Sequence, residues 1–177
     1  MDDLLISIIA IGIATVLMFI FPLMTMSDRT DDISQLTVKL ATTEFVDQVR
    51  TSGKITLEDY SQLITNLGST GNTYSIEMEA KILDENPGRK ITNASGNTKI
   101  GENVYYSIYT SQIENVLYKN NGNNIYYLKE GDIISVNVKN TSQTIAQQLK
   151  NFFYTVVGSE VYTIAAAQTE MVTATGR

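Results

Sequence analysis

The sequence contains no cysteine, histidine or tryptophan among its 177 residues. Without cysteine it cannot form a disulfide framework, a zinc-thiolate site, an iron–sulfur cluster or a cysteine nucleophile. Without histidine it has no Ser-His-Asp triad, no histidine-ligated metal and no histidine acid–base chemistry. These absences exclude most hydrolase and redox-metal classes. We therefore expect no enzyme activity, no cofactor and no bound metal.

Basic residues are also few, with 13 lysines and arginines against 19 aspartates and glutamates, for a net charge of −6. Residues 1–32 hold five aspartates and one arginine, a net charge of −4, which leaves only −2 for the rest of the chain. Nothing supplies a basic stripe that would contact phosphates. No nucleic-acid partner is expected.

Charge is missing altogether from residues 4–26, although the mean hydropathy of the whole chain is only −0.05. As a helix, these 23 residues would be about 35 Å long, enough to span a bilayer. The run lacks the basic start and the small-residue cleavage pattern of a signal peptide. A membrane-length helix is therefore favoured over a buried core helix.

Helical spacing continues past this run, so residues 1–52 predict one helix of about 75 Å. Gly12 is a weak point, and Pro22 should kink or locally melt the helix because it removes a backbone donor. Ser52-Gly53 is a C-cap signal, which divides the chain into 1–53 and 54–177. The second half of the helix should be amphipathic and lie against a domain through its apolar positions, namely Ile33, Leu36, Leu40, Val46 and Val49.

Residues 54–177 predict an α+β fold, a small globular head with a mainly antiparallel sheet and short helices on one side. Thr56 followed by Asp59 resembles a capping box that starts a helix ending at Gly68. The buried stripe of this helix would be Leu57, Tyr60, Leu63, Ile64 and Leu67.

Alternating apolar and polar residues predict strands over 74–82 and 134–138, and further strands are predicted over 125–128 and 161–172. Helical spacing predicts further helices over 109–117 and from Thr141 or Ser142 to Phe153. Asn86-Pro87-Gly88 is a turn. Residues 89–103 predict a surface loop, or a ragged hairpin through Ile91 and Ile100. The closing strand–helix–strand order is consistent with one parallel or same-sheet crossover.

Several polar clusters have a simpler structural interpretation than a chemical one. The acidic cluster 28–32 lacks the glycine of a calcium loop, which favours a solvated helix surface. The pairs Glu58-Asp59 and Asp84-Glu85 suit a helix start and a turn better than a catalytic carboxylate pair. The glycine-bearing loops 68–71 and 96–101 lack the Gly-Lys-Ser/Thr of a phosphate loop, so they predict turns.

Two asparagines, Asn93 and Asn140, fit the N-glycosylation pattern. For Asn140 a helix-capping role is favoured. Sugar stacking or charge transport are alternatives for the tyrosines, but tyrosine is a common strand residue with a polar tip, and this bland interpretation is favoured. The tyrosines in question include Tyr105, Tyr106, Tyr126 and Tyr127.

Asp2 and Asp3 directly precede the apolar run. Carboxylates at a helix N-terminus interact favourably with the helix dipole, so both could simply lie at the membrane surface. Inside a protein bundle they would instead need a cationic partner. The nearest candidate is an α-amino group of this chain or of a neighbour.

The chain resembles the type IV pilin superfamily, including its tight-adherence-like branch, mainly over residues 1–52. The resemblance consists of an uncharged N-terminal segment that starts with an acidic residue, is broken by Pro22 and continues as an amphipathic helix beside an α+β head. Position 5 is Leu5, where these pilins have glutamate, so only Asp2 or Asp3 could neutralise a neighbour's N-terminus. No basic leader is visible, which fits either a chain processed at Met1 or a leaderless relative.

The resemblance implies a structural subunit that polymerises into an extracellular filament at the cell surface and is inserted in the membrane before assembly. Its partners would be copies of itself and a secretion or assembly machinery. The alternative is a single-span membrane-anchored component of a secretion or conjugation apparatus with an extracytoplasmic domain. A membrane-tethered enzyme is disfavoured. Assembly residues are expected to include Met1, Asp2, Asp3, Ile9, Gly12, Ile13, Val16, Phe19 and Pro22.

Overall fold

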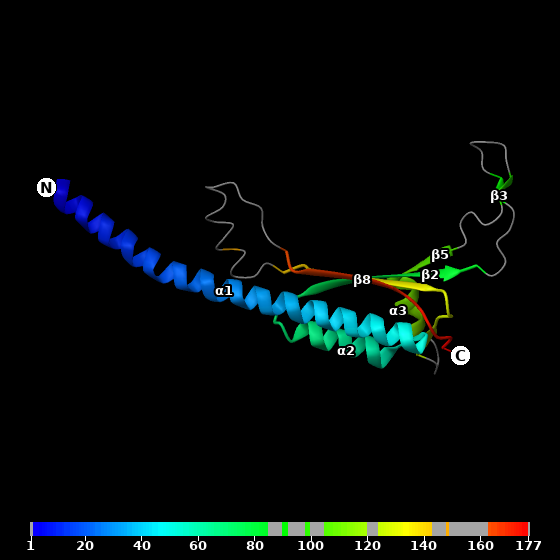
Figure 1. Cartoon of the computed structure of the whole chain (residues 1–177). Coiled ribbons are helices and arrows are strands. Elements are labelled where there is room, and N and C mark those ends of the chain that lie inside the picture. The colour runs from blue at the N-terminus through cyan, green and yellow to red at the C-terminus, as the bar shows by residue number, and fades with distance from the viewer. Residues whose placement is uncertain are drawn as a thin grey trace.

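A computed structural model describes residues 2–84, 90–91, 98–99, 105–119, 124–142, 148 and 163–176. The chain begins with one long helix, α1, from Asp2 to Ser52, and its second half lies against a head with antiparallel sheets (Figure 1). This confirms the predicted long N-terminal helix and the α+β fold class.

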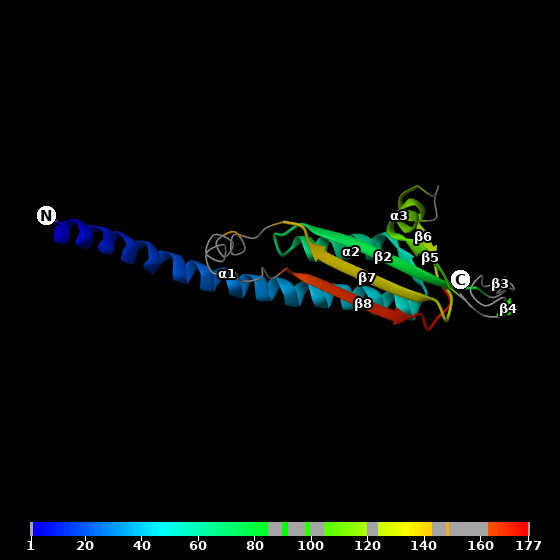
Figure 2. The ribbon, with the colours of Figure 1, turned by 90° about the horizontal axis from the view of Figure 1, so that it is seen from above.

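The helix α1 remains helical through Pro22 and curves gently over its length (Figures 1 and 2). The expected local melting is therefore wrong. Proline removes one backbone N–H donor, but the residues of the turns on either side keep their backbone donors, so the helix continues. The hydroxyl of Thr25 also donates to the carbonyl of Phe21 at 3.0 Å, which gives this region one additional hydrogen bond.

Gly53 ends α1 with a positive φ of 67°, and its N–H donates to the carbonyl of Val49 at 2.9 Å. A short strand, β1 (Lys54–Thr56), then leads into α2 (Leu57–Gly68). The capping box is confirmed, because the Thr56 hydroxyl accepts from the Asp59 N–H and the Asp59 carboxylate accepts from the Thr56 N–H. Ile64, expected in the buried stripe, is instead exposed.

The main sheet has the strand order β5-β2-β7-β8, and all its neighbours are antiparallel. Of the two alternatives for the closing strands, a parallel crossover is wrong, since β7 and β8 pair antiparallel, and a connection within the same sheet is confirmed. The strands are β2 (Tyr74–Leu83), β5 (Tyr105–Tyr109), β7 (Ile133–Asn140) and β8 (Ala165–Met171).

Two small sheets complete the described strands. The first pairs β1 with β6 (Ile125–Tyr127), and the second pairs β3 (Lys90–Ile91) with β4 (Thr98–Lys99), as in the hairpin alternative. Helix α3 runs from Thr110 to Lys119, so Tyr109 ends β5 and does not start the helix. The expected helix to Phe153 and the 86–88 turn lie outside the described residues.

The core lies between one face of the main sheet and three helices, which lie on the same side of the sheet (Figure 1). Helix α1 packs on β7, β8 and α2, and α3 contacts α2 where the Tyr60 hydroxyl donates to Glu114 at 2.7 Å. The second half of α1 contributes a buried set that we call the core stripe, made of Val38, Ala41, Phe45, Val46 and Val49. Half of α1 is therefore part of the head's own core.

Candidate functional site

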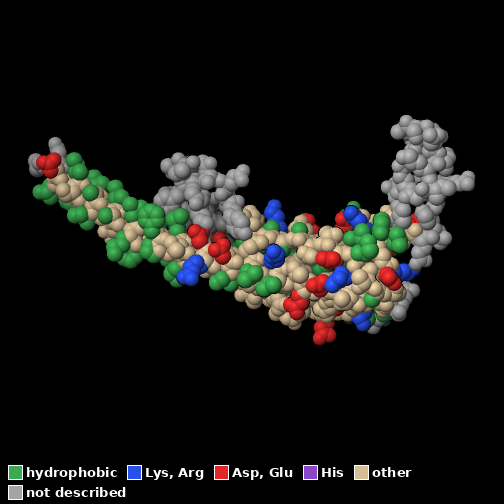
Figure 3. All heavy atoms as spheres, viewed as in Figure 1, with side chains coloured by type: hydrophobic (Ala, Val, Ile, Leu, Met, Phe, Trp, Pro, Cys, Tyr) green, Lys and Arg blue, Asp and Glu red, His purple; other side chains and the backbone are tan. Residues whose placement is uncertain are grey.

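The first half of α1 lies away from the head and has its large apolar side chains exposed around the helix (Figure 3). By length and composition, α1 is able to cross a membrane. The most apolar stretch of this helix has no residue buried against the rest of the described chain. Exposed apolar patches of this size mark contacts with lipid or protein. We call residues 4–26 the apolar segment.

The residues expected to take part in assembly lie on this segment or at its start. Gly12 has no atom within 4 Å of the position that a Cβ would occupy, so its surface is open. Met1 and the side chain of Asp2 lie outside the described part of the chain, whereas Asp3 is exposed in the first turn of α1. The other expected residues are all exposed, namely Ile9, Ile13, Val16, Phe19 and Pro22.

Several hydroxyl groups on and near this surface form hydrogen bonds within the helix. Ser7 donates to the carbonyl of Asp3, and Thr15 donates to the carbonyl of Ile11, both at 2.8 Å. Thr30 makes the same contact with Met26 at 3.1 Å. Because these donors already have acceptors, they need no partner in a lipid or packed-helix environment.

The sequence predicted a solvated helix surface for the acidic cluster 28–32, and this is wrong for one of its residues. Asp31 is only 7% exposed, whereas Arg29 and Asp32 are exposed. The reason is helical spacing, since Asp31 precedes Ser34 and Val38 on the buried side of α1. Within the described residues, no group of three or more histidines, cysteines or carboxylates could hold a metal ion.

Beyond the acidic cluster lies a second apolar surface, the outer ridge, formed by Ile33, Leu36 and Leu40. These side chains are 66%, 57% and 60% exposed. The sequence predicted that these three residues, together with Val46 and Val49, would lie against the head. This prediction is wrong for the three residues of the outer ridge. The head instead covers the face through Val38, so the ridge lies on another side of the same helix.

The second half of α1 is fixed to the head by polar contacts at both ends. The Gln35 amide donates to the Ala165 carbonyl at 2.7 Å and accepts from the Ala165 N–H at 3.0 Å, as a neighbouring strand would. At the other end the Thr173 N–H donates to the Arg50 carbonyl at 3.0 Å.

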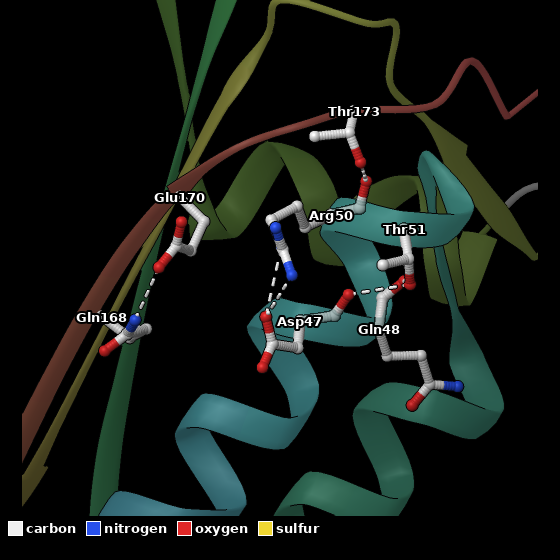
Figure 4. Close-up of polar contacts among 7 residues, drawn as sticks. All are labelled: Asp47, Gln48, Arg50, Thr51, Gln168, Glu170 and Thr173. Carbon is white, nitrogen blue, oxygen red and sulfur yellow. Dashed lines mark hydrogen bonds and ion pairs between the residues drawn. The ribbon is translucent and has the colours of Figure 1, made fainter.

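Figure 4 shows the second end, where the Arg50 side chain also pairs with Asp47 at 3.1 Å. Next to Asp47 in the sequence, Gln48 donates through its side-chain amide to Asp59 of α2 at 2.6 Å. The helix is thus held by β8 and α2 together, and the apolar segment continues from a firmly anchored base.

The other candidate residues have structural roles or lie outside the described parts. The Asn140 side chain is buried, and its Oδ1 accepts from the Ser142 N–H and hydroxyl, both at 2.9 Å. A glycan on Asn140 would require this turn to open. Asp59 caps α2, while Asn93 and Glu85 are not among the described residues.

Comparisons with known proteins add no relative: no family model, curated protein or solved structure matches this chain. The order of a long apolar N-terminal helix followed by an antiparallel head fits a pilin-like fold. The functional argument therefore depends on the surfaces of α1 themselves.

Proposed function

We propose that the protein is a structural subunit that polymerises through α1 into an extracellular pilus-like filament. Before assembly, the apolar segment is held in the membrane, and a secretion or assembly machinery extracts it. The observation that carries this proposal is the outer ridge, an exposed apolar surface on α1 beyond the membrane-length segment.

The argument is one of length. The apolar segment alone is about 35 Å long and fills the hydrocarbon layer of a bilayer. The charged residues Arg29 and Asp32 would then lie at the membrane surface, and the outer ridge would lie in water. A plain anchor leaves this ridge uncovered, whereas α1 of a second copy, shifted along the axis, would bury it against its own apolar side chains.

The acidic start of α1 fits the same arrangement. Asp3 lies in the first turn of the helix, where its charge interacts favourably with the helix dipole. In a dry bundle of helices this carboxylate, or that of Asp2, would pair with the α-amino group of a neighbour. Removing both carboxylates should impair assembly and leave the head folded.

The test is to shear cells that produce the protein and to image the released material by electron microscopy. We expect filaments made of this chain. Leu36→Asp should abolish these filaments, because it places a charge in the outer ridge. Ser61→Asp is the control, because it adds the same charge at an exposed position of α2, and filaments should still form. Circular dichroism should show that both variants remain folded.

The Asp2→Ala/Asp3→Ala variant tests the charge pairing separately. A normal filament yield from this variant would count against pairing with an amine. A chain found only as a membrane monomer, with no filaments, would overturn the main proposal. It would favour the alternative, a single-span membrane-anchored component of a secretion or conjugation apparatus, which the membrane length of the apolar segment also fits.

A further inference from the structure

A pocket of about 350 Å³ lies at one end of the head, far along the chain from the apolar segment. Its walls come from β2, β5, β6 and the turn between β6 and β7, and three of its lining residues are tyrosines. We call it the tyrosine pocket, lined by Ile82, Leu83, Asp84, Tyr106, Tyr126, Tyr127, Lys129 and Asp132.

The fold builds this pocket from segments that are distant in sequence. Tyr106 pairs with Ile82 in the β2–β5 register, and Tyr126 pairs with Ile55 in the β1–β6 register. The aromatic rings of two different sheets therefore meet at one cavity. Pockets of a few hundred Å³ with aromatic walls and a few polar groups are the usual form of small-ligand sites.

The buried carboxylate of Asp132 holds the pocket walls together. One of its oxygens accepts from the Leu83 N–H and the other from the Lys129 N–H, both at 2.8 Å. Asp132 is only 1% exposed, so it acts as a positioning residue. By these two bonds it ties β2 to the turn that carries the Lys129 side chain.

The tyrosines supply ring faces together with hydroxyl groups. The Tyr106 side chain is 53% exposed, whereas Tyr126 is half-buried. Burial, with smaller effects from Tyr106 and Asp132, raises the pKa of Tyr126 to about 12. Its hydroxyl therefore stays a neutral hydrogen-bond donor at all physiological pH values.

The lining carries charges of both signs, an ammonium on Lys129 and carboxylates on Asp84 and Asp132. An ionic ligand is attracted by one sign and repelled by the other, so its charge brings no clear gain. A neutral ligand with an apolar face and many hydroxyl groups can stack on a tyrosine ring and form hydrogen bonds with both kinds of group. From this geometry, we propose that the tyrosine pocket binds a neutral saccharide, with one sugar ring stacked on Tyr106.

The test uses the full chain in a polyoxyethylene detergent, because alkyl maltosides would themselves supply a disaccharide. Saturation-transfer NMR is recorded with maltose, cellobiose, lactose and diacetylchitobiose, and with sialyllactose and choline as anionic and cationic comparisons. We expect transfer to at least one neutral disaccharide that is stronger than to either charged ligand. Transfer to none of the four, or to choline alone, would overturn the proposal.

Variants then locate the binding. Tyr106→Ala should weaken the titrated affinity about fivefold through loss of the stacked ring, and Tyr106→Phe should stay within about twofold. Tyr109→Ala is the matched control, since Tyr109 is an exposed tyrosine on the outer face of the same strand. Unchanged affinity in Tyr106→Ala, with circular dichroism showing a folded head, would also overturn the proposal. Since no step requires polymerisation, the outcome is independent of the filament test.

Discussion

The two halves of α1 belong to one continuous helix but have opposite surroundings. Val16 in the first half is 56% exposed, whereas Val46 in the second half is fully buried beneath the head. The second half is stable because β8 and α2 cover it within the same chain. The first half has no such cover among the described residues, and exposed apolar surfaces of this size are typical of contacts with lipid or protein. The difference separates the half of α1 that folds the head from the half that, in our proposal, brings copies of the chain together.

The largest effect is expected from a charge placed in the core stripe. Val46→Asp would bury an unpaired carboxylate, and we expect it to destabilise the head by more than about 4 kcal/mol. Thermal unfolding followed by circular dichroism, with the full chain in detergent, measures this. Val16→Asp is the matched change in the apolar segment and should leave the unfolding midpoint of the head unchanged. Equal destabilisation by both variants would contradict the division of α1 into two halves.

The next largest effect is expected from a pair of glycines. At Gly53 a Cβ would collide with the carbonyl of Ala174 and with the Gly176 nitrogen, in a backbone conformation with φ of +67°. We expect Gly53→Ala to cost about 2–4 kcal/mol in the free energy of unfolding.

Gly12→Ala is the control for that change, because nothing lies near its Cβ position and alanine favours a helix by about 1 kcal/mol. Chemical denaturation should therefore show a loss for Gly53→Ala alone. If Gly12→Ala blocks filaments in cells while the head stays folded, then close approach of helices at Gly12 is part of assembly.

A smaller effect is expected at the start of α2. Thr56→Ala removes the side-chain half of the capping box, which should cost about 1 kcal/mol. Thr65→Ala on the exposed side of the same helix, where the hydroxyl only returns to the Ser61 carbonyl at 2.9 Å, should cost less. Urea unfolding of both variants compares them, and equal costs would show that the cap contributes nothing specific.

The smallest effect near neutral pH is expected from the tyrosines, all of which follow α1 in the sequence. Burial raises the pKa of Tyr126 to about 12, and burial with the Glu114 hydrogen bond raises the pKa of Tyr60. The folded head then keeps protons that the unfolded chain loses above about pH 10.

Stability should consequently be unchanged below pH 10 and should fall as the pH rises from 10 through 12. Thermal melts across this range should show a shallower decline in Tyr126→Phe than in the parent chain. The helicity of the apolar segment in micelles should not follow this curve, because that segment carries no tyrosine and lies outside the core of the head. A parallel decline of Tyr126→Phe and the parent would contradict the assignment to Tyr126.

Local signals predicted much of the fold. Three of these signals depend only on residues that are close in sequence, so they could be predicted from the sequence alone. They are the uncharged run 4–26, the capping box at Thr56 and the alternation over β2. The strands β1 and β5 are only three and five residues long, and their pairing partners are distant, so no local pattern marks them.

The surfaces were harder to predict than the elements. Both the outer ridge and the core stripe have helical spacing, and only the position of β8 and α2 decides which of them is covered. The tyrosine pocket is less visible still, because Tyr106 and Tyr126 come from different sheets. Their meeting depends on tertiary structure, which a single sequence does not display.

The contact between Gln35 and Ala165 joins residues that are 130 positions apart. During synthesis, therefore, the core stripe of α1 leaves the ribosome long before β8 exists to cover it. Until then both the apolar segment and the core stripe of α1 are without the cover that β8 gives the core stripe in the folded chain. The late synthesis of β8 means that α1 is complete long before the head can close on it, so the order of translation separates the synthesis of the apolar segment from the folding of the head.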